Sequence, residues 1–427
     1  PSEIIDSNRG PFADLPLPKK PDDWDALYVE DNLGREYKQP TAEVIAQTAE
    51  QVRSFDCATV TDVPPIECEA LVALYESTNG AGWNDNTNLL ATTTASNWFG
   101  VTVSDDHVKE LSYGYNNLNG NLPPELGNLS NLQKIGLYYN HLLGNIPTEL
   151  GSLVNLQNLV LNHNSLSGNL PPELGNLSNL TILFLDHNQL TGNIPIQLSN
   201  LSNLEWLSLW GNQFSGSVPS VLGNLNSLTE LNLGGNQFSG NIPPEIGNLI
   251  NLTVLDLGGN QFTGNIPTEF GNLSNLINLS ISGNQLSGGI PTELSNLSNL
   301  GNISLSSNQL TGNIPPELGN LSNLTSLFLS DNQFTGNIPL QIGNLINLGR
   351  LDLSQNQFTG SIPSELGSLS NLYNLYLNNN NFEGYIPETF INLVNLHDGD
   401  GLDLGYNYLN ISGYSTELIN FLDFKDP

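Results

Sequence analysis

The sequence has no methionine, two cysteines, and only ten lysines and arginines against 42 aspartates and glutamates in 427 residues. The formal net charge of −32 repels phosphate backbones and anionic lipid, which excludes nucleic acid and anionic membrane surfaces as partners. No run of about 18 apolar residues occurs, so the sequence predicts no membrane-spanning helix. Because it starts at Pro1, we expect a processed or trimmed chain whose targeting signal has been removed.

The two cysteines, Cys57 and Cys68, lie eleven residues apart in an otherwise cysteine-free chain. A zinc site needs more ligands at closer spacing. We therefore predict one small disulfide, with two buried thiols as the alternative.

Sequence signatures of catalysis are also missing. There is no glycine-rich phosphate-binding loop, no GxSxG elbow and no HExxH pair. An open sheet is a poor place to exclude water from a reaction. We expect a protein that is not an enzyme and that needs no cofactor.

What the sequence does contain is an internal repeat of 24 residues. Twelve asparagines recur in register at this spacing, and one more follows after 27 residues. Glycine follows each of the first twelve after four residues and proline after seven, while apolar residues stand five and three positions before. These spine asparagines are Asn116, Asn140, Asn164, Asn188, Asn212, Asn236, Asn260, Asn284, Asn308, Asn332, Asn356, Asn380 and Asn407.

The repeat predicts a coil that closes once per period. The segment LxLxx alternates apolar and polar residues, which indicates a short strand with its leucines inward. An asparagine after that strand can bond backbone groups that the turn leaves unpaired, so stacked coils form an asparagine ladder. We expect a second strand over GxIP, and GNLSNL returning the chain on the other side. Each coil must bury its leucines against its neighbours.

The motif LxxLxLxxNxLxGxIPxxLGNLxN, over about residues 108–410, resembles the plant-type leucine-rich repeat. The segment CEALVALYESTNGAGW…NWFGV, from Cys68 to Val101, resembles the N-terminal cap of such proteins. Plant receptors usually place a cysteine pair around the tryptophan that corresponds to Trp98, but here Ser96, Asn97 and Val103 flank it. This residue pattern is more similar to secreted bacterial members of the family. The resemblance implies an α/β repeat solenoid. This is a right-handed superhelix with a parallel sheet on the concave face, short helical or turn segments on the convex face and a helical N-terminal cap.

Four segments follow from these patterns. Residues 1–56 hold an extended, proline-rich arm and an amphipathic helix over 41–55, and residues 57–107 form the cap with a helix over 65–77. Residues 108–410 form about 12–13 repeats. Residues 411–427 form a C-terminal cap with a short helix over 414–424.

Aromatic side chains gather at the outward positions of the first repeats, which lie six, four, two and one residues before each spine asparagine. From Gly234 to Ser307 the last two of these positions hold only glycine and serine. We predict that the aromatic residues face water and bind a ligand; packing against the N-terminal arm and stiffening of the sheet are the alternatives. The predicted ligand-binding residues, with an isolated cation and its neighbour, are Tyr138, Tyr139, His163, Phe184, Asp186, His187, Trp206, Trp210, Arg350 and Asp352.

Two of the charged groups have simpler interpretations. Arg350 either anchors an anionic ligand group or relieves acidic repulsion beside Asp352 and Asp331, and the second is favoured. His163 and His187 occupy the same position in adjacent repeats and could share a metal ion, although surface histidines are the simpler interpretation. The insertion HDGDGLDL offers a weak calcium candidate in Asp398, Asp400 and Asp403, against an ordinary acidic turn.

Function follows less directly than fold. The resemblance implies an extracellular or cell-surface recognition or adhesion module that binds a protein, peptide or glycan on the concave face. The alternative is a structural subunit of a surface layer or filament, which self-associates through the arm and the solenoid edges. Ice binding is a minor alternative, because Ser or Thr recurs three residues after the spine asparagines from Ser167 to Thr359.

Overall fold

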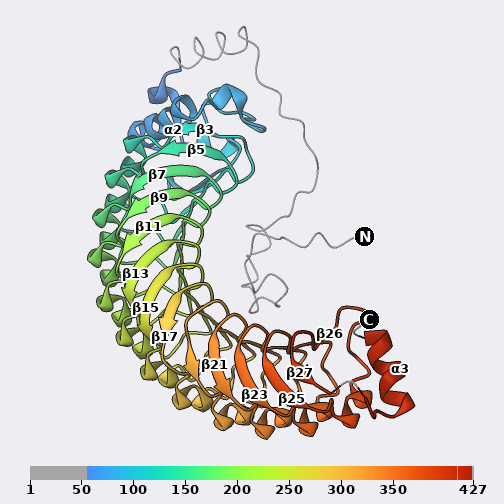
Figure 1. Cartoon of the computed structure of the whole chain (residues 1–427). Helices are drawn as coiled ribbons and strands as arrows, with labels where there is room; N and C mark the ends of the chain where they lie inside the picture. Colours follow the sequence, from blue (N-terminus) through green and yellow to red (C-terminus); the bar gives the residue numbers. More distant parts are fainter. Residues whose placement is uncertain (1–54, 411, 426–427) are drawn as a thin grey trace. The chain divides into compact units, whose positions relative to one another are not determined.

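The computed structural model describes residues 55–410 and 412–425, which belong to two compact units, Pro1–Gln213 and Phe214–Pro427. The predicted arm and the helix over 41–55 lie outside the described residues, apart from Phe55. Within each unit, successive coils place short strands side by side and 3₁₀ turns along the opposite border (Figure 1).

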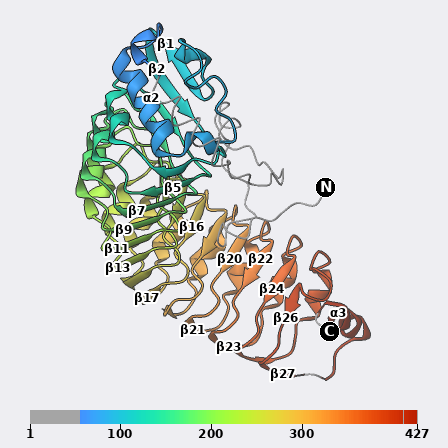
Figure 2. The same ribbon diagram turned by 90° about the horizontal axis from the view of Figure 1, so that it is seen from above.

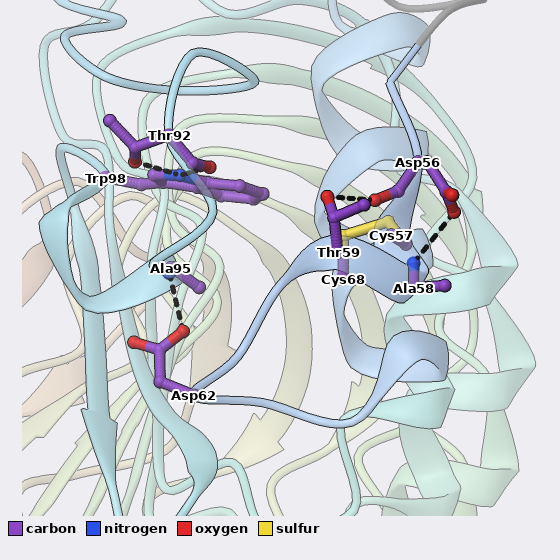
Figure 3. Close-up of a disulfide and its surroundings, with 9 residues drawn as sticks. All are labelled: Asp56, Cys57, Ala58, Thr59, Asp62, Cys68, Thr92, Ala95 and Trp98. Atoms are coloured by element: carbon purple, nitrogen blue, oxygen red, sulfur yellow. Dashed lines mark hydrogen bonds between the residues drawn. A yellow bond between two sulfur atoms is a disulfide. The ribbon is translucent and has the colours of Figure 1, made fainter.

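The first unit begins with the helix α2 (Pro65–Ser77), which has the bounds that the sequence predicts. Cys57, in the 3₁₀ turn η3 (Cys57–Thr59), forms a disulfide with Cys68 of α2, with the two Cα atoms 5.6 Å apart (Figure 3). The segment after α2 contains the turns η4 (Gly80–Gly82) and η5 (Ala95–Asn97). Backbone hydrogen bonds join it to the first coil, as from Asn119 N–H to the Thr78 carbonyl at 2.9 Å.

The main sheet of the first unit starts with an antiparallel pair and continues in parallel, and Figure 2 shows β1 and β2 beside α2. A second row of parallel strands follows the spine asparagines, and 3₁₀ turns close the coils. The main strands are β1 (Val101–Ser104), β2 (His107–Ser112), β4 (Lys134–Gly136), β6 (Asn158–Val160), β8 (Ile182–Phe184) and β10 (Trp206–Ser208). The second row holds β3 (Asn119–Asn121), β5 (His141–Gly144), β7 (Ser165–Asn169) and β9 (Gln189–Gly192), and the turns are η6 (Pro124–Asn128), η7 (Thr148–Ser152), η8 (Pro172–Asn176) and η9 (Ile196–Asn200).

The second unit repeats the same plan, with every main strand parallel to the next. Its main strands are β12 (Glu230–Asn232), β14 (Val254–Asp256), β16 (Asn278–Ser280), β18 (Asn302–Ser304), β20 (Ser326–Phe328), β22 (Arg350–Asp352), β24 (Asn374–Tyr376) and β26 (Leu402–Asp403). The second row comprises β11 (Gln213–Gly216, which begins at the last residue of the first unit), β13 (Gln237–Asn241), β15 (Gln261–Asn265), β17 (Gln285–Ser287), β19 (Thr311–Gly312), β21 (Gln333–Gly336), β23 (Gln357–Gly360), β25 (Asn381–Gly384) and β27 (Tyr408–Leu409). The turns are η10 (Ser220–Asn224), η11 (Pro244–Asn248), η12 (Thr268–Asn272), η13 (Thr292–Asn296), η14 (Pro316–Asn320), η15 (Leu340–Asn344), η16 (Ser364–Ser368) and η17 (Glu388–Asn392), and the unit ends in α3 (Thr416–Lys425).

The asparagine ladder forms as predicted, and Asn188 is typical of it. Its side-chain N–H groups donate to the carbonyls of Leu161, Leu185 and Asp186 at 3.0–3.3 Å. Its side-chain oxygen accepts the Leu166 N–H of the preceding coil at 2.9 Å. From Asn140 onward, each spine asparagine pairs backbone groups in its own coil and in the one before, whereas the Asn116 side chain bonds Asp85. The leucines of the repeat fill the core between the coils.

The predicted position of the second strand was wrong. In the fifth repeat the GxIP segment reads GSVP over residues 216–219, but β11 ends at Gly216. Pro219 instead stands immediately before η10 as its N-cap residue. The residues directly after the spine asparagine extend the second row, because the N–H of Phe214 is bonded to the next spine oxygen, on Asn236, at 3.0 Å.

Two further findings concern helices. The C-terminal helix α3 starts at Thr416 rather than 414, because the Ser415 hydroxyl accepts the Leu418 N–H at 3.1 Å and so caps the helix. In the described part of the chain, no helix has both the length and the apolar character that crossing a membrane requires.

Candidate functional site

The residue immediately before each spine asparagine has a left-handed backbone conformation throughout the described coils. A bulky residue there is strained by about 1–2 kcal/mol, because its Cβ approaches the next carbonyl oxygen, whereas glycine is not. The observed φ angles lie between 51° and 64°. The residues at this left-handed position are, in order, Tyr115, Tyr139, His163, His187, Gly211, Gly235, Gly259, Gly283, Ser307, Asp331, Gln355, Asn379 and Tyr406.

The rings at the first four left-handed positions stack on one another. Centroid distances are 4.4 Å from Tyr115 to Tyr139, 3.9 Å from Tyr139 to His163 and 4.0 Å from His163 to His187, with interplanar angles of 9–18°. Trp210 continues the series at 4.6 Å from His187, tilted by 52°. We call these five rings the ring stack. The strand register brings the first four rings together, because equivalent positions of successive coils lie one strand spacing apart. Trp210 reaches the stack from the residue before the left-handed Gly211 of its coil.

The expectation that all the aromatic residues face water was wrong. Tyr138, Val160, Ile182 and Phe184 are buried, with 5–8% of their surface exposed, and form an apolar cluster on the outer face of the sheet. Val160 of β6 lies directly opposite Phe184 of β8, Ile182 lies in β8 as well, and Tyr138 comes from the preceding coil. Burial raises the pKa of the Tyr138 hydroxyl to about 12, with a smaller contribution from the charge of Tyr115.

The two tryptophans belong to different groups, which the sequence did not predict. Trp206 lies in β10, opposite Ile182 of β8, and packs against the apolar cluster. Trp210 lies two residues beyond the end of β10 and joins the ring stack. The strand is only three residues long, so the alternation that would place both rings on one surface does not reach Trp210. Both side chains are half-buried.

Polar groups border the ring stack. Asp186 and His163 lie with Oδ2 and Nε2 4.0 Å apart, and their side chains are 15% and 24% exposed. Asn162, adjacent to His163, is 3% exposed, and its side-chain oxygen has no hydrogen-bond donor among the residues that the structure describes. Asn162 was not among the predicted site residues, although it stands two residues before a spine asparagine, as Tyr138 and Asp186 do.

The cations Lys134 and Arg350 have different neighbours. Lys134 forms an ion pair with Glu110 of the adjacent strand at 3.3 Å. Arg350 lies over the Tyr373 ring, 5.2 Å from its centroid. Asp352 accepts hydrogen bonds from the Ser354 N–H at 3.0 Å and from its hydroxyl at 2.6 Å. Arg350 and Asp352 belong to the second unit and are not part of the ring stack.

The weak calcium candidate is not supported by the geometry. Asp398 is paired with Lys425, and Asp403 accepts the Gly405 N–H at 2.9 Å. Asp400 offers its backbone carbonyl to the Tyr376 hydroxyl at 3.0 Å. Among the described residues, the group of three potential ligand side chains that lie close enough for a metal ion is His163, Asp186 and His187.

Comparisons with known proteins agree with this architecture. The family described as "Leucine-rich repeat region" matches residues 108–239 and 221–336, and "Leucine Rich Repeat" matches 347–369 and 371–393. No curated protein matches the sequence.

Solved structures with similar folds include two plant-type receptors and one bacterial protein. The plant peptide hormone receptor RGFR1, in complex with RGF2, is 41% identical over 70% of this chain and 47% of its own, with a TM-score of 0.69. PEPR1, solved with AtPEP1, is 32% identical over 84% of this chain and 54% of its own, with a TM-score of 0.72. A leucine-rich repeat protein of Leptospira interrogans is 34% identical over 74% of this chain and 81% of its own, with a TM-score of 0.56.

The chain spans about half the length of the two plant receptors. The family matches cover more than half of this chain, and the repeat geometry is that of the receptors. The chain therefore belongs to the leucine-rich repeat proteins of the plant type.

Proposed function

We propose that the protein is a recognition module that binds an extended peptide or protein segment across the ring stack and the apolar cluster of its first unit. RGFR1 is a plant peptide hormone receptor and was solved in complex with RGF2, which supports a ligand of this class. The residues that make the contact are Tyr139, His163, Asp186, His187, Trp206 and Trp210, and the buried Tyr138 and Phe184 support them from the apolar cluster. Arg350 and Asp352 are outside this proposal, because they lie in the second unit.

The observation that carries the proposal is the choice of side chain at the left-handed position. Glycine occupies it without strain at Gly211, Gly235, Gly259 and Gly283. Tyr139, His163 and His187 occupy it with φ of 51–53°. The backbone therefore gains nothing from these rings, and a strained residue that the fold does not require is a candidate for function.

The arrangement of the rings favours a peptide over a glycan. A sugar usually lies against the flat face of an aromatic ring, but both faces of Tyr139 and His163 are covered by neighbouring rings at 3.9–4.4 Å. The ring edges carry the Tyr hydroxyls and the His N–H groups, which match the carbonyls and amides of an extended peptide. The adjoining apolar cluster provides contacts for its side chains.

The proposed setting is outside the cell, as for receptor ectodomains, and the proposed activity is binding without catalysis. Adhesion would be one use of such a module. Assembly into a surface layer, or ice binding by the Ser and Thr residues of the second strand row, would each leave the ring stack without a role.

Selection from a random peptide library tests the proposal. We expect wild-type protein to enrich a family of peptides that is lost on a variant carrying Tyr139→Gly, His163→Gly and His187→Gly. These changes suit the left-handed backbone, so the variant should remain folded. The absence of any enriched peptide, or equal enrichment on both proteins, would contradict the proposal. Concentration-dependent self-association by sizing would instead favour the structural subunit.

A further inference from the structure

We infer that His163, Asp186 and His187 form a binding site for a divalent transition-metal ion of the zinc type. One ligand atom from each of these residues can be chosen so that all three lie within 4.8 Å of one another. The three residues also belong to the proposed peptide contact, but ion binding is tested separately, because it is measured without a peptide.

The coil geometry brings the three side chains together. His163 and His187 occupy the left-handed position of consecutive coils, so their side chains leave the backbone in the same direction. Asp186 precedes His187, and its carbonyl accepts the His163 N–H at 2.9 Å. This bond fixes the carboxylate next to the imidazole of the preceding coil, with Oδ2 4.0 Å from Nε2 of His163.

The distances suit a small ion after a modest adjustment. Zinc binds imidazole nitrogen and carboxylate oxygen at about 2.0–2.2 Å, which places tetrahedral ligands about 3.3 Å from one another. Ligand atoms within 4.8 Å therefore need to approach by at most about 1.5 Å. Rotation about the Cα–Cβ and Cβ–Cγ bonds of half-buried side chains can provide this movement.

The stack itself must change when the ion binds. The His163 and His187 rings are 18° from parallel, with centroids 4.0 Å apart, so their in-plane lone pairs lie side by side and do not converge. An ion held by both nitrogens requires one ring to tilt, which opens the stack at this point. Trp210, 4.6 Å from His187, would then report the binding through its fluorescence.

The ligand types identify the class of ion. Two imidazoles and one carboxylate suit zinc, nickel or copper, whereas calcium and magnesium prefer all-oxygen sites. The Asn162 oxygen, buried without a donor among the described residues, stands at the same position as Asp186 one coil earlier. A cation in the adjacent site would stabilise its partial negative charge.

Calorimetric titration of the untagged full-length protein with Zn²⁺, in the absence of any peptide, tests the inference. We expect one ion per chain and a change in tryptophan fluorescence on binding. Co²⁺ should give the absorption spectrum of a tetrahedral N/O site. His163→Gln and His187→Gln should each weaken binding at least tenfold, and the double variant should abolish it.

His141→Gln is the matched control, because His141 is exposed and lies outside the three-residue group; it should bind Zn²⁺ as the wild type does. Asp186→Asn tests the carboxylate and should also weaken binding. The inference is overturned by the absence of Zn²⁺ binding at millimolar concentration, or by wild-type affinity in the double His variant. Neither result bears on peptide selection, so the two proposals can fail separately.

Discussion

The left-handed position of the coil is filled differently in two regions of the molecule. In the first unit it carries Tyr115, Tyr139, His163 and His187, whose rings stack at 3.9–4.4 Å. In the second unit its first residues are Gly235, Gly259 and Gly283, with no side chains. The φ angles differ by little, 51–55° against 61–64°, so the same backbone accepts both solutions.

This difference separates what the fold requires from what the surface provides. The fold requires a left-handed residue before every spine asparagine, and glycine meets that requirement without strain. The rings of the first unit recover about 0.5–1.5 kcal/mol per pair by stacking, which is similar to the strain they introduce. Their presence is therefore close to neutral for stability, and their use lies in the surface that they form.

The largest loss of stability is expected from replacing a spine asparagine, a feature that the two regions share. Asn188 and Asn260 each donate to three backbone carbonyls and accept one N–H of the preceding coil. Replacing either with leucine leaves these buried groups unpaired, and we expect a loss of about 3 kcal/mol in both cases. Amide hydrogen exchange of the affected coils measures this loss. A large loss in one unit and none in the other would show that the spine does not act equally in both.

An exchange of residues between the regions should have a smaller effect. Gly259→Tyr introduces strain at φ 62° with no ring beside it and should destabilise its unit by about 1–2 kcal/mol. Tyr139→Gly removes the strain and the stacking together and should change stability by less than about 1 kcal/mol. Thermal unfolding of the two variants checks the difference. If Tyr139→Gly were the more damaging change, the rings would be structural.

The smallest effect on stability is expected for two carboxyl groups with opposite pKa shifts, the buried Asp256 and the partly exposed Asp62. Burial raises the pKa of Asp256 in the second unit, and the hydrogen bond from the Gly258 N–H offsets this only in part. Partial burial also raises the pKa of Asp62, which lies before the coils. The N–H groups of Ser96 and Ala95 donate to its carboxylate and outweigh this effect, so the pKa of Asp62 lies below the ordinary value.

The two shifts give opposite dependences of stability on pH. A lowered folded-state pKa stabilises above the unfolded-state value of about 4, and this contribution is lost as the pH falls. Asp62→Asn should therefore unfold at a lower temperature than the wild type at pH 7, and this difference in melting temperature should shrink below about pH 4. A raised folded-state pKa means that the ionised carboxylate destabilises the fold at pH 7. Asp256→Asn should therefore unfold at a higher temperature than the wild type at pH 7. Thermal unfolding at pH 7 and pH 3.5 measures both variants. If the two substitutions changed the melting temperature in the same direction, this account would be contradicted.

Most of the fold could be predicted from the sequence because the same residue pattern recurs in every coil. The spacing of the spine asparagines, the inward leucines, the bounds of α2 and the choice of Cys57 and Cys68 as partners all follow from local pattern and spacing. The second strand was misplaced because each spine oxygen accepts an N–H from the preceding coil, as Asn236 does from Phe214, and a single repeat does not display this contact between coils.

The candidate site was harder to predict for the same reason. The sequence pattern identified the aromatic residues. Strand β10 is only three residues long, so Trp206 joins the apolar cluster and Trp210 joins the ring stack. The burial of Tyr138 and Phe184 depends on which side chains the neighbouring coils place beside them, such as Val160 opposite Phe184, and periodicity alone does not specify this. Asn162 was missed because its buried oxygen becomes notable only when its lack of a donor among the described residues is known.

Peptide affinity, measured for matched glycine variants of the two regions, tests the central claim most directly. The ring variant carries Tyr139→Gly, His163→Gly and His187→Gly, and the control carries Ser307→Gly, Asp331→Gly and Gln355→Gly at the same backbone position of the second unit. With a peptide selected on the wild type, we expect the ring variant to bind at least a hundredfold more weakly, since several stacked contacts are lost. The control should bind within about twofold of the wild type, because it keeps the rings. Wild-type affinity in the ring variant, or an equal loss in the control, would contradict the assignment of the ring stack as the recognition surface.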